Sequence, residues 1–278
     1  MPTIPTDVRE LRTLYGFNAG NVLTLTNPKV LKSAAIAPTA VLHLLPKYRG
    51  SCPAAGSCAS LCLNTAGNPA YLKGKLACRK RRSDAFADHP RAFVRLLFLE
   101  VLRFASKNQG APVLGLRLNG TSDFLWERVT VAIDAELADY VAQAFNVARP
   151  PVGTFALFSL LRSLVPALQP YDYTKRTDRD WAAAKRQGYH LSLSYGSSAD
   201  TVTEALSRGL NLAAGFDLPR NAALPASIKV AGSILPVVDG DLTDWRPGDP
   251  DSGTHIIGLR IKRTPGQTPE QRQAFCIA

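Results

Sequence analysis

The sequence predicts an α/β protein that folds as a full or partial β/α barrel, with mostly parallel strands and a cysteine loop near its N-terminus. Short apolar runs that end in polar residues recur along the chain, and helical or irregular pieces separate most of them. Short strands alternating with helices are typical of a parallel sheet, and about six or seven such units favour a barrel. No repeat or linker divides the chain, so we expect a single α/β domain over residues 1–278.

The composition is that of a protein that needs no disulfide to fold. The chain has 278 residues, of which 46% are hydrophobic, enough to bury a substantial core. It holds five cysteines, an odd number, and its first residues lack the basic and apolar regions of a signal peptide. Its apolar runs contain charges and are shorter than the ~20 residues that a membrane span needs. We therefore expect a cytoplasmic protein with no membrane partner.

The first predicted element is a buried strand at Val41–Leu45, which a proline ends at residue 46. That strand leads into the cysteine loop, residues 50–67. Apolar residues at helical spacing then predict two consecutive helices, Leu72–Ala87 and Arg91–Lys107. Further short strands are expected in Val113–Asn119, before Tyr171, and in His190–Tyr195, Leu210–Phe216, Leu235–Asp239 and His255–Lys262.

Polar side chains follow these predicted strands. They are Asn119, Thr121, Ser122 and Asp123; Asp172, Tyr173, Thr174 and Lys175; Ser194; Asp217; and Asp239 and Asp241. In β/α barrels the chemistry takes place at the carboxyl ends of the strands. A polar turn explains any one of these residues, but their recurrence favours a shared site at this end of the sheet.

Cys52, Cys58 and Cys62 form one candidate metal-binding loop, with five and then three residues between them. Small residues and a glycine allow this loop to curl around a bound centre. Three thiolates suit a 4Fe-4S cluster whose fourth iron stays open, as enzymes that use S-adenosylmethionine require. Free structural cysteines are a further reading. The main alternative is zinc, with a fourth ligand from His43, Cys78 or His89.

The chain is a polycation, because 33 lysines and arginines outnumber 22 acidic residues and give a formal charge of +11. Such a field attracts nucleic acid or anionic metabolites. The basic residues are densest in the segment Lys73–Arg82, which is therefore a candidate phosphate-binding helix face. A solvated helix surface explains the same charges equally well.

A group of acidic residues near the C-terminus offers a different chemistry. It comprises Asp239, Asp241, Asp244 and Asp249, to which Asp123 and Glu127 add carboxylates from another strand end. Converging carboxylates can bind a divalent cation and support a phosphodiester hydrolase, although aspartates beside glycine and proline are more often turn formers. The sequence contains no P-loop, nucleophile elbow, zincin or dinucleotide-binding motif.

Several segments spread from end to end of the chain carry a family resemblance. They are Cys52–Gly67, Leu116–Glu127, Tyr171–Lys175, Tyr189–Ser194, Gly209–Ala213, Val238–Arg246 and Gly258–Lys262. On these segments the chain resembles the gene product 88 family of phage and plasmid proteins, whose plan is similar to that of radical S-adenosylmethionine barrels. The resemblance implies that Cys78 lies outside the family pattern. It also implies an insertion at about residues 130–168, with an extra helix in Gly153–Leu168.

The leading hypothesis is therefore an iron-sulfur protein similar to radical S-adenosylmethionine enzymes, acting on a nucleic acid or nucleotide. Asn119, Ser122 and Ser194 are the expected cofactor-binding residues, and the expected catalytic residues are Asp123, Tyr171, Asp172, Lys175, Asp239 and Asp241. The main alternative is a non-enzymatic phage protein that binds nucleic acid and uses zinc or iron-sulfur as a structural staple. A weaker alternative is the carboxylate-dependent hydrolase.

Overall fold

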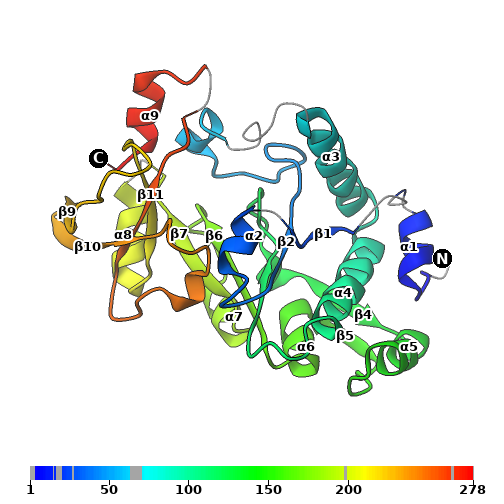
Figure 1. The fold of residues 1–278 in the computed structure, drawn as a ribbon. Helices are drawn as coiled ribbons and strands as arrows, with labels where there is room; N and C mark the ends of the chain where they lie inside the picture. The colour runs from blue at the N-terminus through cyan, green and yellow to red at the C-terminus, as the bar shows by residue number, and fades with distance from the viewer. Residues whose placement is uncertain are drawn as a thin grey trace.

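The computed structural model describes residues 4–14, 16, 21–26, 28–62, 71–196, 199–263 and 266–277. A nine-stranded sheet runs in the order β1-β2-β3-β6-β7-β8-β11-β10-β9, and a separate two-stranded sheet pairs β4 with β5. In Figure 1, α4 and α6 lie beside the early strands, and α8 and α9 lie beside the late ones. The predicted α/β class with mostly parallel strands is confirmed.

The strands of the large sheet are β1 (Leu23–Thr24), β2 (Thr39–Leu42), β3 (Leu114–Arg117), β6 (Leu168–Thr174), β7 (His190–Ser194), β8 (Leu212–Phe216), β9 (Ser227–Val230), β10 (Ser233–Asp239) and β11 (Ile256–Arg260). The edge strands β1 and β9 pair antiparallel with β2 and β10. The strands between these edges, in the spatial order β2-β3-β6-β7-β8-β11-β10, all pair parallel with their neighbours in this series. The carboxyl ends of these strands therefore meet at one edge of the sheet, as the sequence predicted.

The described part of the chain contains nine α-helices, of which α3 to α8 lie between successive parallel strands from β2 to β8. They are α1 (Val8–Leu14), α2 (Pro28–Ser33), α3 (Leu72–Asp88), α4 (Pro90–Ser106), α5 (Ala135–Phe145), α6 (Leu157–Leu164), α7 (Trp181–Arg186), α8 (Ala199–Arg208) and α9 (Pro269–Phe275). The two helices predicted after the cysteine loop are confirmed as α3 and α4, which meet at His89. Pro90 begins α4, because proline fits the first helical turn, where the backbone N–H has no intrahelical partner.

The main hydrophobic core lies around α4. Its side chains are almost all buried, because it packs against α1, α3, α5 and α6. Phe93 and Leu97 belong to a cluster that includes Leu116 of β3 and Leu168 of β6. A second cluster joins α8 to the strands β7, β8 and β11. These clusters fix the strands and leave the loops at their carboxyl ends to form a site.

Residues 130–168, the expected insertion, form a β-α-β-α unit. β4 (Thr130–Ile133) pairs antiparallel with β5 (Gly153–Ala156), and α5 lies between them in the sequence. The helix expected over Gly153–Leu168 is shorter than predicted, because its first residues form β5 and only Leu157–Leu164 is helical. β4, α5 and α6 all contact α4. The unit therefore extends the core and does not contribute to the strand-end edge.

The large sheet is open in the described part of the chain, with β1 at one edge and β9 at the other. The closed form of the predicted barrel is therefore not found among the described strands. The sheet stays open because an antiparallel strand ends the series of parallel strands at each of its two edges. Over the described ranges, no helix is long and apolar enough to cross a membrane.

Candidate functional site

A cavity of about 280 Å³ lies at the carboxyl ends of β3, β6 and β7. The cysteine loop forms part of its wall and contributes Cys52, Cys58 and Cys62. Residues that follow the strands form another part, among them Asn119, Ser122, Asp123, Lys175 and Ser194. The structure therefore brings the three predicted metal ligands together with many of the predicted strand-end residues.

Hydrogen bonds hold the cysteine loop against the sheet. The Ser51 hydroxyl donates to the Leu45 carbonyl at 2.8 Å, and the Asp123 N–H donates to the Ser51 carbonyl at 2.6 Å. The short 3-10 helix η1 (Gly56–Ala59) then turns the chain, and Gly56 begins it with φ of 47°, a left-handed conformation that favours glycine. Residues 63–67 of the predicted loop lie outside the described residues.

The thiols of Cys52 and Cys58 are half-buried, and burial raises the pKa of each. All three thiols of the loop lie close enough to interact electrostatically with one another. The Lys175 ammonium opposes the effect of burial on the pKa of Cys58, because it stabilises the thiolate. The thiolate is the form that binds metals. The positive charge of a bound metal centre would therefore stabilise the Cys58 thiolate further, as Lys175 does.

The donor set fits a thiolate-bound metal centre. Thiolate ligands select zinc, copper(I) or iron-sulfur clusters. Among the described residues, no three Cys, His, Asp or Glu side chains are arranged to hold one metal ion. A cluster differs from a single ion, because each cysteine ligand binds a different iron. Cys78 lies on α3 and Cys276 lies just after α9, and neither is among the residues that line the cavity.

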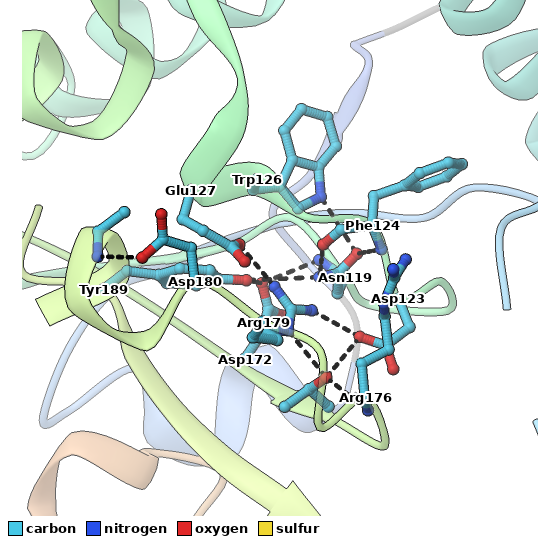
Figure 2. Close-up of polar contacts among 12 residues, drawn as sticks. Asn119, Asp123, Phe124, Trp126, Glu127, Asp172, Arg176, Arg179, Asp180 and Tyr189 are labelled. Atoms are coloured by element: carbon cyan, nitrogen blue, oxygen red, sulfur yellow. Dashed lines mark hydrogen bonds and ion pairs between the residues drawn. The ribbon is translucent and has the colours of Figure 1, made fainter. Parts of the chain in front are cut away.

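Asn119 organises the turn after β3, as Figure 2 shows. Its Oδ1 accepts hydrogen bonds from the Ser122 hydroxyl at 3.0 Å, the Phe124 N–H at 2.9 Å and the Trp126 indole N–H at 3.1 Å. Its Nδ2 donates to the Phe124 carbonyl at 2.9 Å. The ligand-binding roles of Asn119 and Ser122 stay predictions, and both side chains already stabilise this turn.

Asp123 connects the cavity to a buried ion-pair network (Figure 2). Its Oδ1 accepts from the Thr174 hydroxyl at 2.8 Å and from Arg179 Nη2 at 2.6 Å, and its Oδ2 accepts from the Lys175 N–H at 2.9 Å. Nη1 of Arg179 lies 2.7 Å from Oε2 of Glu127. One arginine therefore binds both carboxylates, which the sequence had placed in a possible cation-binding group.

Lys175 lies at the end of β6, between the cysteine loop and α9. Its ammonium donates to the Tyr195 carbonyl and lies 5.5 Å from the centre of the Phe275 ring. Burial lowers the pKa of Lys175, and the neighbouring Cys58 thiolate acts in the opposite direction. Lys175 thus presents a positive charge to the cavity beside a predicted metal ligand.

Asp172 lies within β6 and is fully buried, away from the cavity lining. Its Oδ2 accepts hydrogen bonds from the N–H groups of Leu118 and Asn119 at 2.9 and 3.0 Å, and from the Tyr189 hydroxyl at 2.9 Å. Burial raises the pKa of Asp172 to about 6, although Arg117 opposes the rise. The carboxylate ties β6 to the end of β3.

Tyr171 also lies within β6 and is not among the cavity residues. Its ring is buried against Trp245, with the ring centroids 5.1 Å apart. The sequence placed Tyr171 and Asp172 after a strand end, whereas β6 continues to Thr174. Their catalytic roles stay predictions that the cavity geometry does not support.

Each carboxylate of the acidic group near the C-terminus lies beside an arginine. The pairs are Asp239 and Asp241 with Arg260, Asp244 with Arg117, and Asp249 with Arg246. Asp239 and Asp241 do not line the cavity. The convergence of carboxylates that a cation-dependent hydrolase requires is therefore not found in the described part of the chain.

Sequence reasoning missed three charged or aromatic residues that line the cavity: Lys47, Arg117 and Phe275. Arg117 is buried, and its guanidinium lies 5.2 Å from the centre of the Tyr173 ring. An arginine inside the apolar run Val113–Asn119 was the available signal. No local pattern marks Lys47 or Phe275, because only the fold brings these distant segments to the end of β6.

The predicted basic helix divides its cations between the interior and the solvent. Arg79 and Arg82 are buried. Arg79 and Lys75 interact electrostatically with the Cys62 thiol. Lys80 forms an exposed ion pair within α3. Binding of nucleic acid by this segment stays a prediction, with fewer cations facing outward than the sequence indicated.

The family model of gene product 88 matches residues 17–278. The chain belongs to this family. The gene product 88 match includes the whole cavity, and it confirms the resemblance that the sequence segments indicated. No curated protein and no solved structure matches the chain.

Proposed function

We propose that this gene product 88 protein binds a 4Fe-4S cluster through Cys52, Cys58 and Cys62. A small ligand such as S-adenosylmethionine would bind beside the cluster. The observation that carries the proposal is that three thiols and the residues after β3, β6 and β7 line one cavity. Parallel α/β folds bind their ligands at the carboxyl ends of strands. The cavity volume of about 280 Å³ is close to the ~300–1,000 Å³ of small-molecule sites.

Three cysteine ligands leave one iron of a 4Fe-4S cluster without a protein ligand. When bound, such a cluster supplies single electrons to a ligand at the open iron. The protein's own groups would hold that ligand: Lys175 offers N–H donors, and Ser122 and Ser194 offer hydroxyl oxygens. Phe275 and the small residues of the cysteine loop would exclude water from it.

The strand order supports a partial β/α barrel as the scaffold. β2, β3, β6, β7 and β8 lie side by side in chain order, and all their pairings are parallel. Right-handed crossovers that always advance in one direction place the connecting helices on one face of a sheet and let it curl. The 3-10 helix η5 (Arg246–Gly248) contacts β6 and β7. We infer that η5 fills the concave face.

The proposed substrate is a nucleic acid or a nucleotide. The formal charge of +11 favours association with polyanions, and the affinity of such binding falls steeply as salt increases. Fluorescence anisotropy with labelled DNA and RNA at several salt concentrations tests this part separately. Binding too weak to measure at low salt would contradict a nucleic-acid substrate and leave the cluster proposal unaffected.

Anaerobic purification followed by iron, sulfide and zinc analysis tests the cluster. We expect about four irons and four sulfides per chain, and loss of both in the triple alanine variant of Cys52, Cys58 and Cys62. Cys78→Ala is the matched control, because Cys78 is half-buried but outside the cavity lining. Stoichiometric zinc without sulfide in the wild-type protein would contradict the cluster and make the loop a structural staple.

Cleavage of S-adenosylmethionine tests the enzymatic part. The cluster-loaded protein is reduced with dithionite, and products of the nucleoside half are measured by chromatography. Turnover that disappears in the triple alanine variant would support the proposal. Absence of cleavage, together with salt-sensitive binding of nucleic acid, would instead favour a non-enzymatic binding protein.

A further inference from the structure

Positive charge surrounds the cysteine loop. We call these residues the cationic shell: Lys47, Lys75, Arg79 and Lys175. Lys47 and Lys175 interact electrostatically with the Cys58 thiol, and Lys75 and Arg79 with the Cys62 thiol. The carboxylate of Asp123 lies near Cys52, and Arg179, which Asp123 shares with Glu127, leaves that trio with one net negative charge against the four cations of the shell. The immediate surroundings of the three thiols therefore carry excess positive charge.

Lys175 is the member of the cationic shell with the most restricted environment. It is half-buried, its ammonium donates to the Tyr195 carbonyl, and the Phe275 ring lies beside it. Across the described ranges, no carboxylate forms an ion pair with Lys175. A partly desolvated ammonium is costly unless a negative charge offsets it. Two groups that line the same cavity can supply such a charge, the Cys58 thiolate and the Asp123 carboxylate, and Asp123 already binds Arg179.

We propose that Lys175 raises the reduction potential of the cluster bound by the three cysteines. The inference rests on the proposed function, because it needs the cluster. On reduction, one electron passes from an external low-potential donor to the cluster; the donor is oxidised, and no protein bond forms or breaks. The cluster and its thiolates become more negative by one charge. A fixed cation beside Cys58 therefore stabilises the reduced state more than the oxidised state.

The positions of the two lysines beside Cys58 predict a graded effect. Lys175 is half-buried, whereas Lys47 is exposed and donates to the Ala59 carbonyl at 2.8 Å. Solvent screens an exposed charge more strongly than a buried one. Removing the charge of Lys175 should therefore change the potential more than removing the charge of Lys47.

The experiment compares four substitutions in the full chain, one of them Lys47→Met, each purified anaerobically, with iron and sulfide measured before each potential. Lys175→Met removes the charge and keeps an unbranched side chain, whereas Lys175→Arg keeps the charge. Lys185→Met is the control, because Lys185 is exposed on α7 and does not line the cavity. The midpoint potential is measured by dithionite titration, followed by absorption and electron paramagnetic resonance.

We expect the preference for the reduced cluster to fall roughly tenfold in Lys175→Met, which is about 59 mV for a one-electron couple. Lys47→Met should show a smaller shift in the same direction. Lys175→Arg and Lys185→Met should retain the wild-type potential. This order separates the charge of Lys175 from its packing, because the arginine variant alters the side chain and keeps the charge.

Full cluster occupancy with equal potentials in wild type and Lys175→Met would overturn the inference and leave the proposed function standing. A wild-type protein without iron and sulfide would instead contradict the proposed function, before any potential is measured. If Lys175→Met folds by circular dichroism but stays empty, the cluster is reconstituted chemically and Lys175→Gln is measured in its place. Equal potentials in Lys175→Gln and wild type would then overturn the inference.

Discussion

Nη2 of Arg179 lies 2.6 Å from Oδ1 of Asp123, and the arginine side chain in this pair is 0% exposed. The same guanidinium binds Glu127, whose side chain is also 0% exposed. Because one buried guanidinium binds two carboxylates, we expect this ion-pair network to contribute to the free energy of unfolding of the protein.

Arg179→Met should reduce the free energy of unfolding by about 3–5 kcal/mol, because it leaves two buried carboxylates without their cation. Urea denaturation followed by circular dichroism measures the change. The matched control is Arg149→Met, which removes an exposed pair with Asp139 and should cost about 0–1 kcal/mol. Equal effects of the two substitutions would show that the Arg179 network contributes no special stability.

Asn119→Ala should destabilise the turn that ends β3. The substitution removes the acceptor of three hydrogen bonds, two of them from the Phe124 N–H and the buried Trp126 indole. Since each buried donor without an acceptor costs about 1–3 kcal/mol, we expect a total loss of roughly 2–5 kcal/mol. Urea unfolding tests this against Asn108→Ala, which removes one hydrogen bond at the end of α4.

His190 should make the protein less stable as the pH falls. Burial, with the nearby Arg246, lowers the pKa of His190 to about 4 from its ordinary 6.5. Between these values the unfolded chain binds more protons than the folded one, so stability is lost as pH decreases through this window, by roughly 3 kcal/mol. Asp172 and Asp249 act oppositely, because burial raises the pKa of each to about 6.

The measurement that isolates His190 is the difference in unfolding free energy between wild type and His190→Gln across pH 4–7. As the pH falls from 7 to 4, the unfolding free energy of wild type should decrease relative to that of His190→Gln, because glutamine does not titrate. A constant difference across this range would mean that His190 is not held neutral by the fold.

Gly120→Ala should destabilise the contact between β2 and the turn after β3. A Cβ at residue 120 would lie 2.5 Å from Val41 Cγ1 and 2.7 Å from the Leu42 carbonyl oxygen. Overpacking of this kind costs about 1–3 kcal/mol. Gly110→Ala is the control, since a Cβ there would meet nothing within 4 Å. Thermal unfolding distinguishes the two variants. An unchanged melting temperature in Gly120→Ala would mean that β2 can shift without loss of stability.

The sequence predicted the elements better than their exact ends. Helical periodicity predicted α3 and α4 almost to the residue, and apolar side chains repeat along α4, whereas the buried residues of α3 include Arg79 and Arg82. The end of β6 was placed too early, because Tyr171 and Asp172 are interior strand residues, and Oδ2 of Asp172 accepts its hydrogen bonds within the fold. A local pattern cannot show whether a polar residue faces a buried partner or a cavity.

The candidate site was predictable where chemistry is concentrated in the sequence and unpredictable where it is assembled by the fold. Three clustered cysteines, with Lys175 and Ser194 after apolar runs, indicated the residues that line the cavity. Asp239 and Asp241 also follow an apolar run in the sequence, but in the structure they bind Arg260. Pairing between arginines and aspartates far apart in the chain leaves no mark on a local pattern.

The wall of the cavity contains both Pro46 and Phe275. During synthesis the cysteine loop leaves the ribosome long before α9 does, and a domain folds as a unit. The cysteines are therefore exposed to the cell's oxidants and stray metals while the last part of their enclosure is still being translated. For the proposed cluster, assembly would therefore compete with oxidation of the thiols until translation of the chain is complete.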